Sequence, residues 1–175
     1  MQKIVLRIPE DRLGVIIGKD GSVKKRLEEE TNCRIIVSSE GVVAIESEDA
    51  VGFLKAQDVI KAIGSGFSPE VAFKLLSDDF IILDVISLDF SPNNLQRIKG
   101  RIIGKGGKFR KAIEDMLGVN VSVHHKSVAI IGEIENVNAA REAINMIING
   151  HQHSTVYRFL ENKRREIKMK SLDWK

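Results

Sequence analysis

One eight-residue phrase occurs twice in this chain, as GVIIGKDG from Gly14 to Gly21 and as GRIIGKGG from Gly100 to Gly107. In both copies two isoleucines precede a Gly-x-x-Gly turn that carries lysine at its first variable position. One glycine turn can arise by chance, but two turns in the same apolar frame, 86 residues apart, indicate a duplicated module. The repeat therefore predicts a chain built from two domains of the same fold.

The correspondence between the copies continues after the turns. At the same offset, Lys25 aligns with Lys111 and Glu28 aligns with Glu114. Apolar positions also coincide through one helical segment and two strand-like segments. About 70 residues per copy are enough for a small independent core. We therefore expect a first domain, a connector helix, a second domain and a C-terminal basic helix, at residues 1–66, 67–78, 79–150 and 151–175.

Hydrophobic periodicity and turn residues predict the same element order in each copy, namely strand, helix, glycine loop, helix, two strands and helix. In the first copy, Asp49 is placed to cap a last helix that runs to Ile63 and is expected to bury Phe53 and Leu54. One short connector helix is predicted at residues 71–76. The expected fold class is α+β, with a three-stranded sheet and helices on one face of it in each domain. In the second copy, the two helices after the glycine loop are expected at 108–117 and 137–148.

Composition places the chain among ordinary globular proteins. Hydrophobic residues make up 43% and charged residues 29%. No apolar run approaches the ~20 residues that span a bilayer, and the first residues lack the apolar region of a signal peptide. We therefore expect a cytoplasmic protein without membrane contact. The single Cys33 and the spacing of the histidines predict no disulfide, no metal site and no cofactor.

Charge is distributed unevenly along the chain. The net charge is +3 overall, but residues 1–87 contain 11 Lys and Arg against 15 Asp and Glu. Residues 88–175 contain 16 basic residues against 9 acidic ones. The second half is therefore the better candidate for binding a polyanion; a solvated basic surface is the alternative.

The Gly-x-x-Gly loop has the chemistry of a phosphate-binding turn. Glycine tolerates positive φ and leaves no Cβ in the path of a ligand. The helix that follows begins with unsatisfied N–H groups and a partial positive charge, which both favour phosphate. Lys19 and Lys105 add a mobile cation, and the isoleucines before each loop provide apolar surface on which bases can rest. Single-stranded nucleic acid is therefore the leading ligand.

At these residues the chain resembles the KH-domain family in its type I element order. KH loops of the form GXXG clamp about four nucleotides of a single strand. The resemblance implies that the second copy binds RNA, with its phosphate clamp at the glycine loop and a basic border beside it. The RNA-contact residues predicted for this copy are Gly100, Arg101, Ile102, Ile103, Gly104, Lys105, Gly106, Gly107, Lys108, Arg110, Lys111 and Val121.

The first copy departs from the KH loop at one position. Asp20 stands where a neutral or basic residue would help, and its carboxylate would repel a phosphate. This copy is therefore expected to bind RNA more weakly or to serve as a docking surface for protein. Its candidate RNA-contact residues are Gly14, Ile17, Gly18, Lys19, Gly21, Lys24 and Lys25.

A closer resemblance is found in the second half of the chain. The segments GRIIGKGGKFRKAIED, VAIIG, AREAI and HSTVYRFLE, with GFSPEVAFKLL before them, are similar to archaeal members of the partner-of-Nob-one family of KH-domain ribosome-assembly proteins. The resemblance implies binding near the 3′ end of small-subunit rRNA in the pre-ribosomal small subunit, in cooperation with the endonuclease that matures this end. Lys163, Arg164 and Arg165 of the basic helix are a further candidate contact for rRNA or protein, or only a solvated surface.

The glycine motifs do not fit an enzyme. A Walker loop needs G-x-x-x-x-G-K followed by Ser or Thr, whereas Gly100 and Gly104 are four residues apart and Gly106 follows Lys105. No Ser/His/Asp set and no carboxylate pair stands out. We therefore expect a non-catalytic RNA-binding protein; the alternative is a general KH RNA-binding or protein-docking adaptor in RNA processing or transcription.

Overall fold

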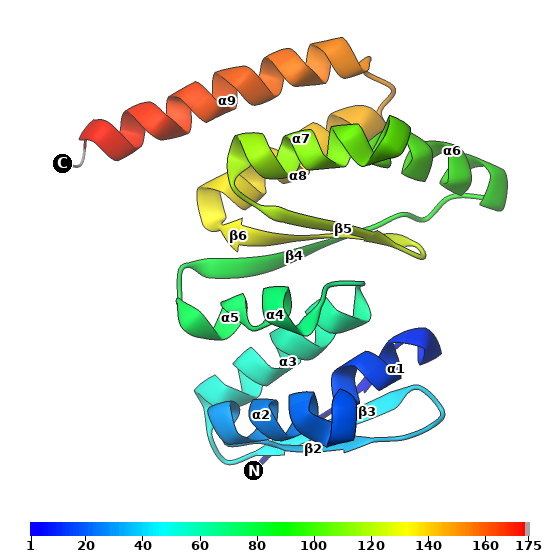
Figure 1. Ribbon diagram of the computed structural model, residues 1–175, viewed down its shortest axis with the longest axis vertical. Coiled ribbons are helices and arrows are strands. Elements are labelled where there is room, and N and C mark those ends of the chain that lie inside the picture. Colours follow the sequence, from blue (N-terminus) through cyan, green and yellow to red (C-terminus); the bar gives the residue numbers. More distant parts are fainter. Residues whose placement is uncertain (174–175) are drawn as a thin grey trace. The chain divides into compact units, whose positions relative to one another are not determined.

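Each half of the repeat forms a three-stranded antiparallel sheet with helices packed on it (Figure 1). The computed structural model describes residues 1–173, and its contacts divide the chain into one unit of Met1–Asp79 and a second that begins at Phe80. The α+β fold predicted from the repeat is therefore confirmed. Within the described residues, no helix combines the length and the apolar character needed to cross a membrane.

In the first unit, the central strand alternates between core and solvent. The elements run β1 (Gln2–Arg7), α1 (Glu10–Ile17), α2 (Ser22–Thr31), β2 (Arg34–Val37), β3 (Val42–Ser47) and α3 (Ala50–Gly64). The sheet order is β1-β3-β2, so β2 is an edge strand. Val43, Ile45 and Ser47 of β3 are buried, as expected for a sheet with helices on one face.

The start of the last helix of this unit agrees with the sequence, but the burial of one of its residues does not. Asp49 caps α3 as predicted, since its side chain accepts a hydrogen bond from the Gly52 N–H at 3.1 Å. Phe53 is buried, but Leu54 is exposed, so its predicted burial is wrong. The physical reason is helix geometry, because Leu54 lies on the same helix face as the exposed Asp58 and Lys61.

The connector consists of two one-turn helices, α4 (Pro69–Ala72) and α5 (Lys74–Ser77), so the single helix predicted at 71–76 is wrong. Phe73 lies between them. Its carbonyl accepts a hydrogen bond from the N–H of Leu76, three residues later, at 3.0 Å. The Phe73 ring is buried and lies 4.1 Å from the Arg26 guanidinium. The buried Phe73 side chain therefore anchors the connector at the junction of the two short helices.

The second unit repeats the path and adds one long helix. Its sheet has the order β4-β6-β5, with β5 at the edge. The helix predicted at 137–148 begins three residues earlier, and the C-terminal helix begins at His153. The elements are β4 (Ile81–Ser87), α6 (Pro92–Ile103), α7 (Lys108–Leu117), β5 (Asn120–His124), β6 (Ser127–Glu133), α8 (Ile134–Ile148) and α9 (His153–Asp173).

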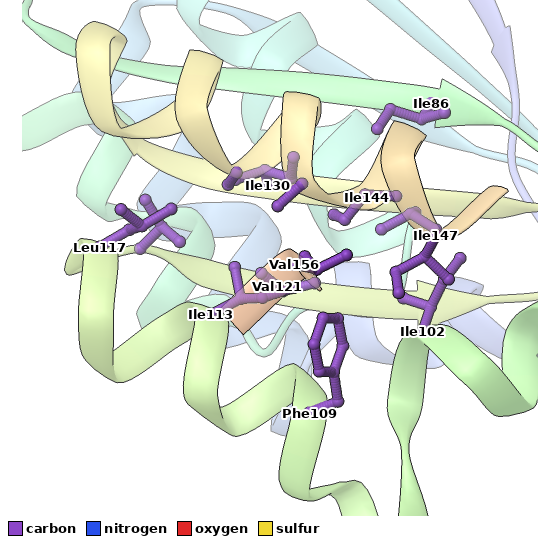
Figure 2. Close-up of a cluster of buried hydrophobic side chains, with 14 of the residues drawn as sticks. Ile86, Ile102, Phe109, Ile113, Leu117, Val121, Ile130, Ile144, Ile147 and Val156 are labelled. Carbon is purple, nitrogen blue, oxygen red and sulfur yellow. The ribbon is translucent and has the colours of Figure 1, made fainter. Parts of the chain in front are cut away.

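Helix α9 is part of the core of the second unit. Figure 2 shows Val156 of α9 among the side chains of α7, α8 and the sheet, beside Ile113 and Val121. Val156 and Leu160 are fully buried, whereas Lys163 onward is half-buried or exposed. The first turns of α9 therefore stabilise the domain, and its later turns present the basic residues to solvent.

Candidate nucleic-acid interface

The two glycine loops have the same backbone conformation. Gly18 has φ 76° and ψ 176°, and Gly104 has φ 77° and ψ 172°. Asp20 has φ 56° and ψ 28°, close to the φ 62° and ψ 23° of Gly106. Asp20 therefore occupies a left-handed conformation that glycine adopts without cost in the second loop. The loops differ in the chemistry they present rather than in their shape.

The first glycine of each loop is required by packing. A Cβ on Gly104 would lie 2.6 Å from the Phe109 Cβ, and a Cβ on Gly18 would lie 2.4 Å from the Val23 Cγ2. Phe109 itself is buried and stacks on His153 of α9, with ring centroids 4.5 Å apart. The turn is thus pressed against the first turn of the following helix, and the core of the domain fixes its position.

The other side of the second loop is open. A Cβ on Gly106 or Gly107 would meet no atom within 4 Å, and the side chain of Lys105 is exposed. Helix α7 begins directly after the loop, so the N–H groups of its first turn lie beside it. Exposed Lys108 and Lys111 add positive charge on the same helix. This arrangement suits a phosphate group.

The paired isoleucines before each loop have different roles. Ile102 and Ile16 are fully buried in the core of their units. The second isoleucine of each pair, Ile103 or Ile17, is partly exposed beside the loop. Only the second one can therefore offer apolar surface to a base.

In the first unit, a groove runs from this isoleucine to the edge strand. It encloses about 410 Å³, within the range of ligand-binding clefts. Its walls come from α1, α2 and β2. The lining residues are Ile17, Lys24, Glu28, Arg34, Ile35, Ile36 and Val37.

The edge strand of each unit is tied to the helix after the loop. Glu114 of α7 accepts a hydrogen bond from the Val121 N–H at 3.0 Å, and Arg110 donates to the Val121 carbonyl at 3.1 Å. Glu28 accepts the matching bond from the Ile35 N–H at 2.9 Å. The side chain of Val121 is buried, so this predicted contact residue can meet RNA only through its backbone.

Arg101 has partners within its own domain. Its guanidinium donates to the carbonyls of Ile147, at 3.1 Å, and His151. His153 in turn contacts the Arg101 carbonyl at 2.8 Å through Nε2. Arg101 therefore joins α6 to the end of α8 and the start of α9. In the first unit Arg12 has the same function at a different sequence position, with bonds to the carbonyls of Ile63 and Phe67 at 2.8 and 2.7 Å.

Replacing Arg101 with alanine should lower the free energy of unfolding by about 2 kcal/mol, because carbonyls at the end of α8 lose a charged donor. Urea denaturation followed by circular dichroism measures the change. Lys108→Ala is the control, since Lys108 is exposed and its removal should alter stability by less than about 0.5 kcal/mol. Equal stability of the Arg101 variant and the unmodified protein would contradict this structural role.

The basic residues of α9 are partly engaged with their neighbours. Lys163 pairs with Glu166 at 3.4 Å and lies 5.7 Å from the centre of the Phe159 ring. Arg165 pairs with Glu161 at 3.9 Å, and Arg164 is exposed. These exposed pairs are weak, so the helix remains a candidate contact surface.

The sequence did not reveal the roles of Arg12, Glu28 and Glu114. The two glutamates carried a signal, because an acidic residue recurs at the same repeat position in the helix that follows each glycine loop. Arg12 gave no such signal, because Arg101, which makes the equivalent bonds in the second copy, does not stand at the matching repeat position.

Comparisons with known proteins cover both units. A KH-domain family model matches residues 3–62, and a model described as the eukaryotic type KH-domain (KH-domain type I) matches residues 79–165. The second match extends into α9, in agreement with the burial of Val156 and Leu160. Over 98% of its length the chain is 43% identical to a KH domain-containing protein of Methanocaldococcus jannaschii, of which it covers 78%.

Two further relatives are described more specifically. The chain is 35% identical over 62% of its length to the pre-rRNA-processing protein PNO1 of Coccidioides immitis, and the match covers only 44% of that protein. A solved complex of a/eIF2alpha, aDim2p and rRNA from Pyrococcus horikoshii OT3 contains a chain with a TM-score of 0.87 and 43% identity. The match covers 94% of this chain and 95% of that one. With KH matches over both loops and this identity along nearly the whole chain, the protein belongs to the PNO1/Dim2-like family of KH-domain proteins.

Proposed function

We propose that this protein binds single-stranded RNA near the 3′ end of small-subunit rRNA and acts in assembly of the small ribosomal subunit. The observation that carries the proposal is the second glycine loop. Its open side at Gly106 and Gly107, the exposed Lys105 and the start of α7 together form a site for consecutive phosphates.

The relatives support the choice of RNA. The chain resembles a protein named for pre-rRNA processing and a protein solved in a complex with rRNA. The second half of this chain contains 16 basic and 9 acidic residues, so its net positive charge favours binding of a polyanion. The solvent-accessible residues between Gly100 and Lys111 and the edge of β5 are the proposed contact region, with the later turns of α9 as an additional surface.

The first unit has a subordinate role in this proposal. Its loop has the same backbone, but it carries the exposed Asp20 at the position of Gly106, and a carboxylate there adds negative charge to the loop. We propose that it binds RNA weakly or docks protein through its groove. The a/eIF2alpha of the solved complex and the endonuclease that matures the rRNA end are the candidate partners.

The role is proposed to be non-catalytic and cytoplasmic. Neither glycine loop has the sequence of a Walker motif, and the buried side chains next to the second loop are apolar. The protein would hold the RNA end in place, while cleavage would belong to the endonuclease.

Binding should weaken steeply as salt rises. With about four phosphates contacted, the dissociation constant for a single-stranded oligonucleotide should rise about 50-fold between 50 and 200 mM salt. Fluorescence anisotropy with a labelled oligonucleotide from the rRNA 3′ end measures this. The same oligonucleotide annealed to its complement is the control and should bind much less, because its bases are stacked and paired. Salt-independent affinity, or equal affinity for the duplex, would contradict the proposal.

A further inference from the structure

One side chain of α9 contacts the residues on both sides of the second glycine loop. His153 is the first residue of α9, and its Nε2 lies 2.8 Å from the carbonyl oxygen of Arg101 in the last turn of α6. Because a carbonyl can only accept, Nε2 donates this hydrogen bond. The same imidazole stacks on the Phe109 ring, with centroids 4.5 Å apart and an interplanar angle of 21°. Arg101 precedes Gly104 by three residues, and Phe109 follows Gly107 by two.

The bond to the Arg101 carbonyl is one half of a reciprocal connection between α6 and α9. The Arg101 guanidinium donates to the carbonyls of Ile147, at the end of α8, and His151, in the link to α9. The side chain of Arg101 therefore bonds to the backbone before α9, and the side chain of His153 bonds to the backbone of α6. A shift of either helix would break hydrogen bonds donated from both.

The Phe109 ring is held on two sides by α9. His153 stacks on its face, and the Tyr157 ring lies 5.3 Å from it at an angle of 82°. Phe109 is buried and points from α7 into the core (Figure 2). A Cβ on Gly104 would lie 2.6 Å from the Phe109 Cβ, so the loop packs directly on the residue that α9 holds.

The first unit forms the same turn without this contact. Val23 stands at the repeat position of Phe109 and has no ring to stack on. The contact is therefore not needed to give the loop its shape. The second loop differs in having Gly106 where the first has Asp20, and glycine loses more conformational freedom than other residues when it is ordered. Contacts that restrict the motion of the loop thus matter more in the second unit.

We propose that His153 is a positioning residue of the second glycine loop, which connects both sides of the loop to α9 and so orders the loop before phosphate binds. This inference rests on the RNA-binding function proposed above. A loop that is already ordered loses less conformational entropy on binding, and the difference appears as higher affinity. The start of α9 thereby contributes to RNA binding through Arg101 and Phe109.

Removal of the imidazole should weaken RNA binding. His153→Ala loses the hydrogen bond and the ring stack, and should raise the dissociation constant for a single-stranded oligonucleotide from the rRNA 3′ end about five- to tenfold. His153→Gln keeps an N–H donor and His153→Phe keeps a stacking ring, so each should recover part of the loss. Fluorescence anisotropy measures the affinities. Unchanged affinity of the alanine variant, or no recovery with either replacement, would overturn the proposal.

Leu160→Ala is the control that separates positioning from stability. Leu160 is fully buried in the same core, about two turns further along α9. Its truncation should lower the urea midpoint at least as much as His153→Ala does, because it leaves a cavity in the core. The dissociation constant should stay within about twofold of that of the unmodified protein. Equal weakening by both variants would show that any loss of packing by α9 lowers affinity, and would refute a specific role of His153.

The amide resonances of the loop give a readout that does not depend on RNA. In nitrogen–proton correlation spectra of the free protein, His153→Ala should shift or broaden the amide signals of Lys105, Gly106 and Gly107, whereas Leu160→Ala should leave them in place. Unperturbed loop signals in the alanine variant of His153 would overturn the positioning role. Failure of the unmodified protein to bind the oligonucleotide would instead overturn the RNA-binding function, and the loop spectra would still decide the role of His153.

Discussion

Replacing Gly106 and Gly107 together with aspartate should raise the dissociation constant for the rRNA oligonucleotide by at least about 100-fold, the effect expected from losing several charged hydrogen bonds to phosphate. Both new side chains would point into open space, so the loss comes from two carboxylates in the phosphate site. The fold should survive, because Asp20 already adopts the conformation of Gly106 in the first unit, and aspartate at Gly107, with φ 76°, costs only about 1–2 kcal/mol of backbone strain. Anisotropy gives the affinity, and circular dichroism verifies the fold.

Two matched variants separate charge from shape. Asparagine at both positions has nearly the size of aspartate and tolerates left-handed conformations, but it has no charge; it should cost far less affinity. Gly21→Asp creates the same acidic pair beside Asp20 in the first loop and should matter less than the change at Gly106 and Gly107. Unchanged affinity after the aspartate substitutions would show that the second loop does not contact RNA. An equal loss of affinity from the substitutions in the two loops would show that both loops bind RNA.

Gly52→Ala should destabilise the first unit by about 3 kcal/mol. The added Cβ would lie 1.9 Å from the Thr31 carbonyl oxygen and 2.9 Å from its carbon, where α3 begins against the end of α2. These are backbone atoms, so relief requires the two helices to separate. The Gly52 N–H also bonds to the capping Asp49, which holds the helix start in place. Urea denaturation followed by circular dichroism measures the loss.

Gly14→Ala is the matched control for this prediction. Gly14 also lies in a helix of the first unit, but a Cβ there meets nothing within 4 Å. Alanine should therefore stabilise α1 by about 0.5–1 kcal/mol, since it reduces the entropy lost on folding. If Gly52→Ala and Gly14→Ala change the free energy of unfolding equally, the contact between the added Cβ and the Thr31 carbonyl is not the cause of the destabilisation.

The sequence predicted those parts of the fold that depend on local signals. Apolar periodicity and the glycine loops gave the element order, and Asp49 marked the start of α3, because a cap acts within one turn of its own residue. The exposed Leu54 and the interrupted connector were missed. Exposure of Leu54 depends on which stripe of α3 packs inward, and an apolar residue beside that stripe fits the periodic pattern almost equally well.

The candidate site was predictable only in part for a related reason. The loops carry their own chemistry, so Lys105 and its flanking glycines could be selected from the sequence. The partners of Arg101 are 46 and 50 residues away, and those of Arg12 are 51 and 55 residues away. Such contacts follow from the assembled helices and strands. The bonds of Glu114 likewise require the register of β5, which the pattern of residues alone does not specify.

The identical backbone of the two loops has a consequence for the history of the gene. Each aspartate codon differs by a single nucleotide from a glycine codon, so one base change at position 20 gives the first loop the sequence of the second, and the reverse change at position 106 is a single step from two of the four glycine codons. Because the backbone already accommodates either residue, neither exchange requires compensating changes elsewhere in the domain. If the loops bind nucleic acid as proposed, a single mutation in such a duplicated gene can strengthen or weaken binding in one copy, while the other copy keeps its own loop unchanged.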